Sequence, residues 1–352
     1  MSIADLARDE IRKLRAYQSA APCNHGLKLN ANESPVETGT LDSGGLNRYP
    51  ALRPAALTQK MAEHYGVVSE NVLVTRGSSE GIDLLIRVFC EPGQDSVLLT
   101  PPVFAMYQVY ASIQGARTIN VPLRIENDFA LDTDELLDAC DENTKLIFLC
   151  SPNNPLGSVV SASQVKTILR SRAGKSVVVL DEAYVEFSDQ DSMASLVSEF
   201  DNLVVLRTLS KALALAGVRC GAVIGATELI PLLDSVLAPY AIASPVIACA
   251  KRALSDQQLA LSSDAIRATV DERERLRREL TKCNAVEKVW PSQANFLFVR
   301  FRSLDTIRRC LEDAGIAIRI YGDELPMKEC ARITVSLQDD NQQLINAIRS
   351  LD

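Results

Sequence analysis

The stretch Ser176-Val177-Val178-Val179-Leu180-Asp181-Glu182-Ala183-Tyr184 decides how this chain is expected to fold. Residues 176–180 are predicted to form a strand, because three valines and a leucine follow one another without a polar break. Such a run is typical of a strand that a parallel sheet buries on both faces. Ligands of these sheets bind outside the carboxyl ends of the strands, so Asp181 is expected at a binding site.

Similar patterns lie on both sides of this stretch, between about residues 57 and 225. Short apolar segments predict further strands at 72–74, 96–99, 116–121, 146–150, 203–207 and 220–224. Segments with helical spacing separate them, at 57–65, 79–90, 104–114, 131–139 and 163–171. This alternation predicts an α/β fold, in which a large domain holds a mostly parallel sheet covered by helices.

The texture of the sequence changes after about Pro239. A long charged helix is predicted at 262–282, followed by strands at 296–300, 316–320 and 332–335 and helices at 304–314 and 341–351. This order predicts a smaller α+β domain. We expect three parts in the chain: an N-terminal arm at 1–40 that packs on the small domain, a large ligand-binding domain at 41–240, and the small C-terminal domain at 241–352.

Composition limits the kind of partner that the protein can have. A net charge of −8 over 352 residues disfavours nucleic acid and anionic membranes as partners. No segment approaches the roughly 18 consecutive apolar residues of a membrane span, and the charged N-terminal residues do not resemble a signal peptide. Nine cysteines without a C-x-x-C pair predict reduced thiols and a cytoplasmic protein. With only His25 and His64, a His-rich metal site is not expected.

Several polar groups follow the predicted strands, and each alone has an ordinary structural interpretation. A lysine such as Lys211 is usually at the surface, and Asp181 could simply cap a helix. Arg219 lies among small and apolar residues, where a guanidinium is unusual unless an anion binds it. Gly77-Ser78-Ser79 at a helix start offers backbone N–H groups to a phosphate. Together, an amine for a Schiff base, a carboxylate for a ring nitrogen and a phosphate cradle indicate pyridoxal 5'-phosphate.

Longer motifs support this interpretation and carry a resemblance to a known family. Over nearly its whole length the chain resembles the fold-type-I, aspartate-aminotransferase-like enzymes. The matching motifs are Leu29-Asn30-Ala31-Asn32-Glu33-Ser34-Pro35, Asn47-Arg48-Tyr49-Pro50, Ser151-Pro152-Asn153-Asn154-Pro155, Asp181-Glu182-Ala183-Tyr184-Val185-Glu186-Phe187, Arg207-Thr208-Leu209-Ser210-Lys211-Ala212, Leu215-Ala216-Gly217-Val218-Arg219-Cys220-Gly221 and Arg332-Ile333-Thr334-Val335. The chain departs from the family pattern at Leu156 and Ser336, and Phe104 stands where a tyrosine is usual.

The resemblance implies a role for each matching residue of the cofactor site. Lys211 would bind the cofactor aldehyde and move the substrate proton, and Asp181 would hold the ring nitrogen in its protonated form. Asn154 and Tyr184 would hydrogen-bond the ring oxygen, while Phe104 would stack on the ring. The phosphate would be bound by Ser78, Ser79, Thr208, Ser210 and Arg219, and by Tyr49 of a neighbouring subunit in a homodimer.

The resemblance also implies the substrate site and the reaction. Arg319 and Arg332 would bind the anionic group of the substrate, and Tyr17 and Asn30 of the N-terminal arm would close over it. The expected activity is transfer of an amino group between a phosphorylated amine and 2-oxoglutarate, which becomes glutamate.

Three alternatives stay open at this point. The first is an aromatic or other amino-acid aminotransferase, and the second is a decarboxylase of a phosphorylated amino acid such as threonine phosphate. The third is an effector-sensing domain of a transcription regulator. This last alternative is disfavoured by the net charge of −8 and by the lack of room for a DNA-binding domain before the predicted core.

Overall fold

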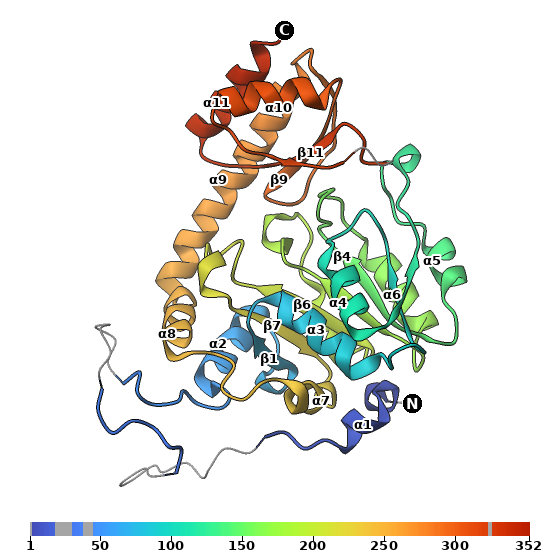
Figure 1. Ribbon diagram of the computed structural model, residues 1–352, viewed down its shortest axis with the longest axis vertical. Helices are drawn as coiled ribbons and strands as arrows, with labels where there is room; N and C mark the ends of the chain where they lie inside the picture. The colour runs from blue at the N-terminus through green and yellow to red at the C-terminus, as the bar shows by residue number, and fades with distance from the viewer. Residues whose placement is uncertain (1, 18–29, 38–44, 323–325) are drawn as a thin grey trace.

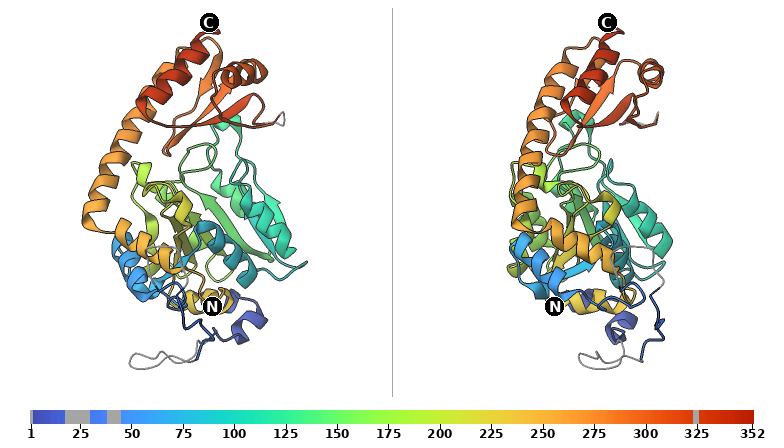
Figure 2. Two further views of the ribbon diagram at one scale, coloured as in Figure 1. Left: turned by 60° about the vertical axis from the view of Figure 1, so that its left-hand side comes forward. Right: turned by 90° about the vertical axis from the view of Figure 1, so that its left-hand side faces the viewer.

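The computed structural model describes residues 2–17, 30–37, 45–322 and 326–352. It has a large lower part and a smaller upper part, and the 26-residue helix α9 (Asp256–Thr281) runs along one side between them (Figure 1). The turned views show the N-terminal end at the base of the large part and the C-terminus at the top of the small one (Figure 2).

A seven-stranded sheet forms the centre of the large domain. Its order is β1 (Val72–Thr75), β7 (Gly221–Gly225), β6 (Leu203–Thr208), β5 (Val177–Asp181), β4 (Thr144–Cys150), β2 (Ser96–Leu99) and β3 (Arg117–Asn120). Strand β7 is antiparallel to both of its neighbours, and the remaining pairs are parallel. The predicted α/β fold with a mostly parallel sheet is therefore confirmed.

Helices cover both faces of this sheet, so each central strand is apolar throughout. Because successive side chains of a strand point to opposite faces, Val177 and Val179 belong to one core and Val178 and Leu180 to the other. The first core also contains α3 (Ser78–Phe89), α4 (Met106–Gln114) and α7 (Leu229–Val236). The second contains α2 (Ala55–Tyr65), α5 (Thr133–Ala139), α6 (Ala162–Ser171) and α8 (Ser244–Ala253).

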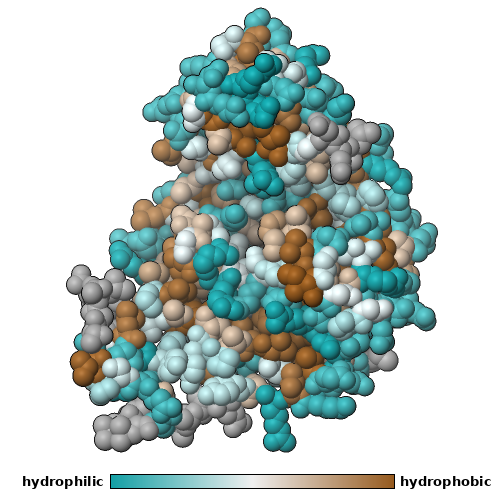
Figure 3. Space-filling view, viewed as in Figure 1, coloured by the Kyte–Doolittle hydropathy of each residue, from teal (hydrophilic) through white to brown (hydrophobic). Residues whose placement is uncertain are grey.

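The small domain is an antiparallel sheet with helices on one face. The strand order is β10 (Arg319–Ile320), β11 (Cys330–Thr334), β9 (Phe296–Phe301) and β8 (Val286–Val289). Its core includes the C-terminal half of α9 together with α10 (Leu304–Asp313) and α11 (Gln338–Arg349). Figure 3 shows hydrophilic colouring over the outer surface of this domain and apolar side chains beneath it, toward the large domain.

The domain boundaries differ from the expected ones at two places. Helix α8 packs into a core of the large domain through Ala250, so this domain extends beyond residue 240 to the start of α9. The beginning of the N-terminal arm packs on the large domain rather than the small one, because Ile3 and Ile11 enter the same core as α7 and Arg8 pairs with Glu91 at 2.7 Å. Residues 1, 18–29 and 38–40 of the expected arm lie outside the described residues.

Two of the sequence-based expectations concern membrane-spanning helices and the state of the cysteines. Within the described ranges, no helix is both long enough and apolar enough to cross a membrane. Cys23 lies outside these ranges, and the remaining cysteines form no disulfide.

Candidate active site

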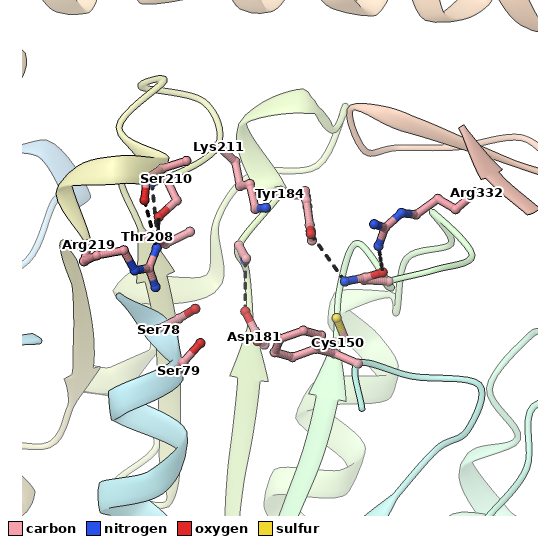
Figure 4. Close-up of a pocket in the computed structure, with 14 residues that line it drawn as sticks. Ser78, Ser79, Cys150, Asp181, Tyr184, Thr208, Ser210, Lys211, Arg219 and Arg332 are labelled. Atoms are coloured by element: carbon pink, nitrogen blue, oxygen red, sulfur yellow. Dashed lines mark hydrogen bonds between the residues drawn. The ribbon is translucent and has the colours of Figure 1, made fainter. Parts of the chain in front are cut away.

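A pocket of about 290 Å³ opens at the carboxyl ends of β4, β5 and β6, below the small domain (Figure 4). It is lined by Ser78, Ser79, Phe104, Cys150, Asn154, Asp181, Ala183, Tyr184, Thr208, Ser210, Lys211, Ala216, Arg219 and Arg332. The pocket thus brings together side chains that the sequence separates by more than 250 residues, from Ser78 to Arg332.

Asp181 is the last residue of β5 and is buried at the floor of the pocket. One carboxylate oxygen accepts a hydrogen bond of 2.7 Å from the Tyr107 hydroxyl, and the other accepts one of 3.1 Å from the Ala183 backbone N–H. Burial raises the pKa of Asp181, against the opposing effect of these hydrogen bonds and of the Lys211 charge. A cationic N–H in the pocket would relieve the burial of this carboxylate and keep it ionised.

Lys211 lies on the turn after β6 and points its amine into the pocket (Figure 4). The Nζ atom is 5.5 Å from the centre of the Tyr184 ring. Burial lowers the pKa of Lys211, and the positive charges of Arg332 and Arg219 lower it further. This environment favours the neutral amine, which is the form that attacks an aldehyde.

A chain of hydrogen bonds links the small domain to the far wall of the pocket. Arg332, on β11, donates to the side-chain oxygen of Asn154, and the Asn154 amide donates to the Tyr184 hydroxyl at 3.4 Å (Figure 4). Phe296 packs against both ends of this chain. Its ring lies 5.2 Å from the Tyr184 ring and 5.3 Å from the Arg332 guanidinium carbon. The geometry of this wall therefore depends on how the two domains pack together.

The opposite wall has the groups of an anion cradle. Arg219 donates to the Ser210 hydroxyl at 3.2 Å, and the Thr208 hydroxyl donates to the same Ser210 oxygen at 3.0 Å. The 12-residue helix α3 begins beside them at Ser78, and its first two residues line the pocket, so the N-terminus of this helix lies at the wall. Gly77, just before the helix, has φ 76° and ψ 170°, and a Cβ there would lie 2.6 Å from Arg219 Nη2. A cation, hydroxyls and a helix N-terminus together suit a phosphate.

Four of the sequence-predicted site residues do not line this pocket. Tyr49 has 54% of its surface exposed and stacks on Tyr240 at 4.6 Å, and the Tyr17 ring lies 6.4 Å from Tyr240. Asn30 is also exposed. Arg319 is exposed and lies directly opposite Arg332 in the β10–β11 pairing, beside the pocket rather than in its wall.

Sequence reasoning missed two side chains with a hydroxyl or thiol group that the structure places in or directly beside the pocket. Tyr107 is fully buried and holds Asp181, while its ring stacks on Phe148 at 4.8 Å. The only sequence signal for Tyr107 was its place one helical turn after Phe104, which puts it near the predicted cofactor site. A tyrosine buried there needs a polar partner for its hydroxyl. Cys150, at the end of β4, also lines the pocket, and burial raises its pKa to about 12, so its thiol stays protonated.

The fold and the pocket define an aminotransferase-like enzyme of fold type I. The chain belongs to the family of class I and II aminotransferases, whose family model matches residues 17–348. It is therefore a pyridoxal-phosphate-dependent transaminase, as the sequence resemblance predicted.

Two histidinol-phosphate aminotransferases and one decarboxylase are among the proteins that this chain is similar to. A curated relative named histidinol-phosphate aminotransferase, from Salmonella schwarzengrund (strain CVM19633), is 42% identical over 353 residues, which cover 99% of this chain and 98% of the relative. A crystal structure of histidinol-phosphate aminotransferase from Sinorhizobium meliloti in complex with pyridoxal-5'-phosphate matches with a TM-score of 0.79 at 25% identity, covering 88% of this chain and 85% of that one. L-threonine-O-3-phosphate decarboxylase from Porphyromonas gingivalis shares the fold, with a TM-score of 0.73 at 22% identity over 87% and 91% of the two chains.

Proposed function

We propose that the protein is a histidinol-phosphate aminotransferase of histidine biosynthesis. It transfers the amino group between L-histidinol phosphate and 2-oxoglutarate, giving imidazole-acetol phosphate and glutamate. The observation that carries this proposal is 42% identity, over 99% of the chain, to a relative of that name. The aminotransferase assignment is favoured over the decarboxylase alternative, because the decarboxylase structure is only 22% identical to this chain and supports a shared fold but not a shared activity.

The pocket fits pyridoxal 5'-phosphate at both of its ends. Asp181 is a buried carboxylate with no cation within hydrogen-bond reach among the described residues, and it suits a protonated ring nitrogen. At the other end, Gly77 leaves space for the Arg219 guanidinium, which a Cβ would displace from the cradle. When bound, this cofactor supplies an aldehyde that condenses with amines and a ring that accepts electrons from the substrate carbon.

The remaining chemistry falls to side chains of the chain. Lys211, whose lowered pKa favours the neutral amine, would hold the aldehyde until the substrate amine displaces it. The freed Lys211 amine would then take the proton from the substrate carbon and pass it back on the cofactor side. Asp181 keeps the ring nitrogen protonated, and Tyr107 holds that carboxylate in place. Asn154 and Tyr184 would hydrogen-bond the ring oxygen of the bound cofactor, and Phe104 would cover its ring.

Substrate binding is assigned to the small domain. Arg332 and Arg319 face the same side of the β10–β11 pair, since residues directly opposite each other share a face. Two guanidinium groups there serve both substrates in turn, one a phosphate monoester and the other a dicarboxylate. Tyr17 and Asn30 are proposed to close over the substrate from the N-terminal arm.

The active form is proposed to be a cytoplasmic homodimer whose partners are small molecules. Tyr49 is more than half exposed and lies outside the pocket of its own chain. In a dimer its hydroxyl would complete the phosphate cradle of the neighbouring subunit. Nucleic acid and membranes are not expected as partners of a chain with net charge −8.

A panel of amino donors tests the substrate assignment. Each donor is incubated with the enzyme and 2-oxoglutarate, and glutamate formation gives kcat/KM. Histidinol phosphate is expected to exceed unphosphorylated histidinol by a large factor, because the phosphate pairs with two guanidinium groups. A ratio near one would refute the phosphate-substrate assignment and favour a general aromatic aminotransferase, while release of carbon dioxide would identify the decarboxylase alternative.

A further inference from the structure

The strands that carry the catalytic groups also carry a pair of charges on their reverse side. Asp181 and Thr208 face the cofactor pocket. Arg207 on β6 points to the opposite face, because successive side chains of a strand alternate, and Glu182, the residue just after β5, meets it there. Glu182 and Arg207 approach each other there at 3.5 Å, with side chains only 2% and 6% exposed.

Arg207 joins three separate segments behind the pocket. Its guanidinium pairs with Glu182 at the end of β5, donates to Glu186 at 2.7 Å, and donates to the Ser192 hydroxyl at 2.9 Å. Glu186 lies two residues after Tyr184 in the same short turn. The guanidinium therefore contacts the segments that follow Asp181 and Tyr184, and Arg207 itself precedes Thr208 on β6.

The surroundings of Arg207 hold it in one orientation. Its guanidinium carbon lies 4.6 Å over the ring of the buried Tyr65, and Glu182 is further fixed by Ser192 and by the Met193 backbone N–H at 2.7 Å. A buried guanidinium between two carboxylates has few other arrangements, because any displacement leaves charges unpaired in a low-dielectric region. The cluster therefore fixes the positions of the segments around Glu182, Glu186 and Ser192 relative to β6.

We propose that Arg207 is a positioning residue for the active site. By fixing the reverse side of β5, β6 and the Tyr184 turn, it sets the spacing of Asp181, Tyr184 and Thr208 around the cofactor. The proposal rests on the proposed function, since it assumes that pyridoxal phosphate occupies the pocket. It predicts that Arg207 influences the cofactor without touching it.

The test compares two buried arginines replaced by lysine in the full-length protein. Arg207→Lys keeps a cation and loses the planar fork that reaches Glu182 and Glu186 together. The control, Arg172→Lys, alters another buried guanidinium, which donates to the Ser176 hydroxyl just before the start of β5. The measurements are the Kd of pyridoxal phosphate for the cofactor-free protein, the visible circular dichroism of the bound cofactor, kcat and KM, and Tm.

Arg207→Lys is expected to weaken cofactor binding and to lower kcat by roughly 10- to 100-fold, by analogy with residues that orient the ligands of a bound metal ion. It should also change the circular dichroism band, with little effect on the KM for histidinol phosphate. Arg172→Lys should lower Tm alone. Equal cofactor spectra, Kd and kcat in the two variants would overturn the proposal.

A second variant keeps the test decisive if Arg207→Lys does not fold. Glu186→Gln preserves the size of a side chain that is 17% exposed and removes one of the two carboxylate charges that pair with Arg207. A several-fold rise in the cofactor Kd with an altered circular dichroism band supports the positioning role, and wild-type values refute it. Failure of the wild-type protein to bind pyridoxal phosphate would instead refute the proposed function, so the two failures are distinguishable.

Discussion

Gly77→Ala is expected to damage the phosphate cradle by displacing Arg219. The backbone at Gly77, with φ 76° and ψ 170°, lies in a region that is essentially restricted to glycine. The added Cβ would also lie 2.6 Å from Arg219 Nη2 and 3.3 Å from its Cζ. Since the guanidinium is the mobile end of a long side chain, it is the group that moves.

The size of the effect follows from these two contributions. Backbone strain at such a position costs about 1–3 kcal/mol of folding free energy. Loss of one hydrogen bond between Arg219 and a charged phosphate costs about 1.5–3 kcal/mol of binding free energy, which is a rise in Kd of roughly 10- to 150-fold. Titration of the cofactor-free protein with pyridoxal phosphate measures the second contribution, and thermal unfolding measures the first.

Gly93→Ala is the matched control for this experiment. Gly93 also has a positive φ, of 72°, but a Cβ there meets no atom within 4 Å. It should lower stability without changing the cofactor Kd. If Gly77→Ala bound the cofactor as tightly as Gly93→Ala, the inferred contact between Gly77 and the Arg219 guanidinium would not control phosphate binding.

Three further predictions concern the amine, the subunit contact and the substrate arginines. Lys211→Met should abolish transamination and the absorption band of the lysine-bound cofactor. In the cofactor-free protein this variant should raise Tm near neutral pH, because burial, Arg332 and Arg219 lower the pKa of Lys211 and its protonated form therefore opposes folding. The gain in Tm should disappear by about pH 10.5, where the lysine of the unfolded chain also loses its proton. A gain in Tm that stayed constant with pH would contradict this linkage. Tyr49→Phe should weaken cofactor binding by about 1.5–3 kcal/mol, and a fully active monomer at nanomolar concentration, detected by sedimentation, would rule out its role across the dimer. Arg332→Ala should reduce kcat/KM for histidinol phosphate and for 2-oxoglutarate alike while the cofactor stays bound, whereas Arg319→Ala should affect the phosphorylated donor more than glutamate; equal losses for phosphorylated and unphosphorylated histidinol would argue against both assignments.

The central sheet was predictable because its strands carry their own signal. The run ending at Asp181 is apolar on both faces, and the structure ends β5 at that residue. The predicted strand at 316–320 was mostly wrong, since only Arg319–Ile320 pair with β11. The Ile316 N–H instead bonds to Leu311 and closes the end of α10. An apolar pattern alone could not distinguish these two outcomes.

Other elements were missed because they lack a periodic signal. Helix α7 is apolar nearly all round and contains Pro231, and β8 has four residues with exposed charges in its middle. The packing of the N-terminal residues on α7 was equally hidden, because apolar side chains such as Ile3 do not specify which domain they cover.

Some residues of the candidate site could likewise be predicted from the sequence, whereas others could not. Lys211, Asp181 and Arg219 could be found from motifs at strand ends, and the structure gathers them around one pocket. The hydrogen bond from Tyr107 to Asp181 and the reverse-side contacts of Arg207 depend on tertiary packing, to which no single motif points. The proposed place of Tyr49 in a neighbouring subunit comes from the family resemblance and stays a prediction.

The bond between Arg332 and Asn154 has a consequence for substrate selection. This guanidinium already has an acceptor before any anion arrives. An incoming ligand therefore enters by exchange, and its affinity reflects the difference between two acceptors on one donor. A neutral hydroxyl gains almost nothing over the amide oxygen, whereas a carboxylate or a phosphate gains a charge-assisted bond. If Arg332 binds the substrate as proposed, this exchange would favour charged ligands over neutral ones, at the cost of some binding strength.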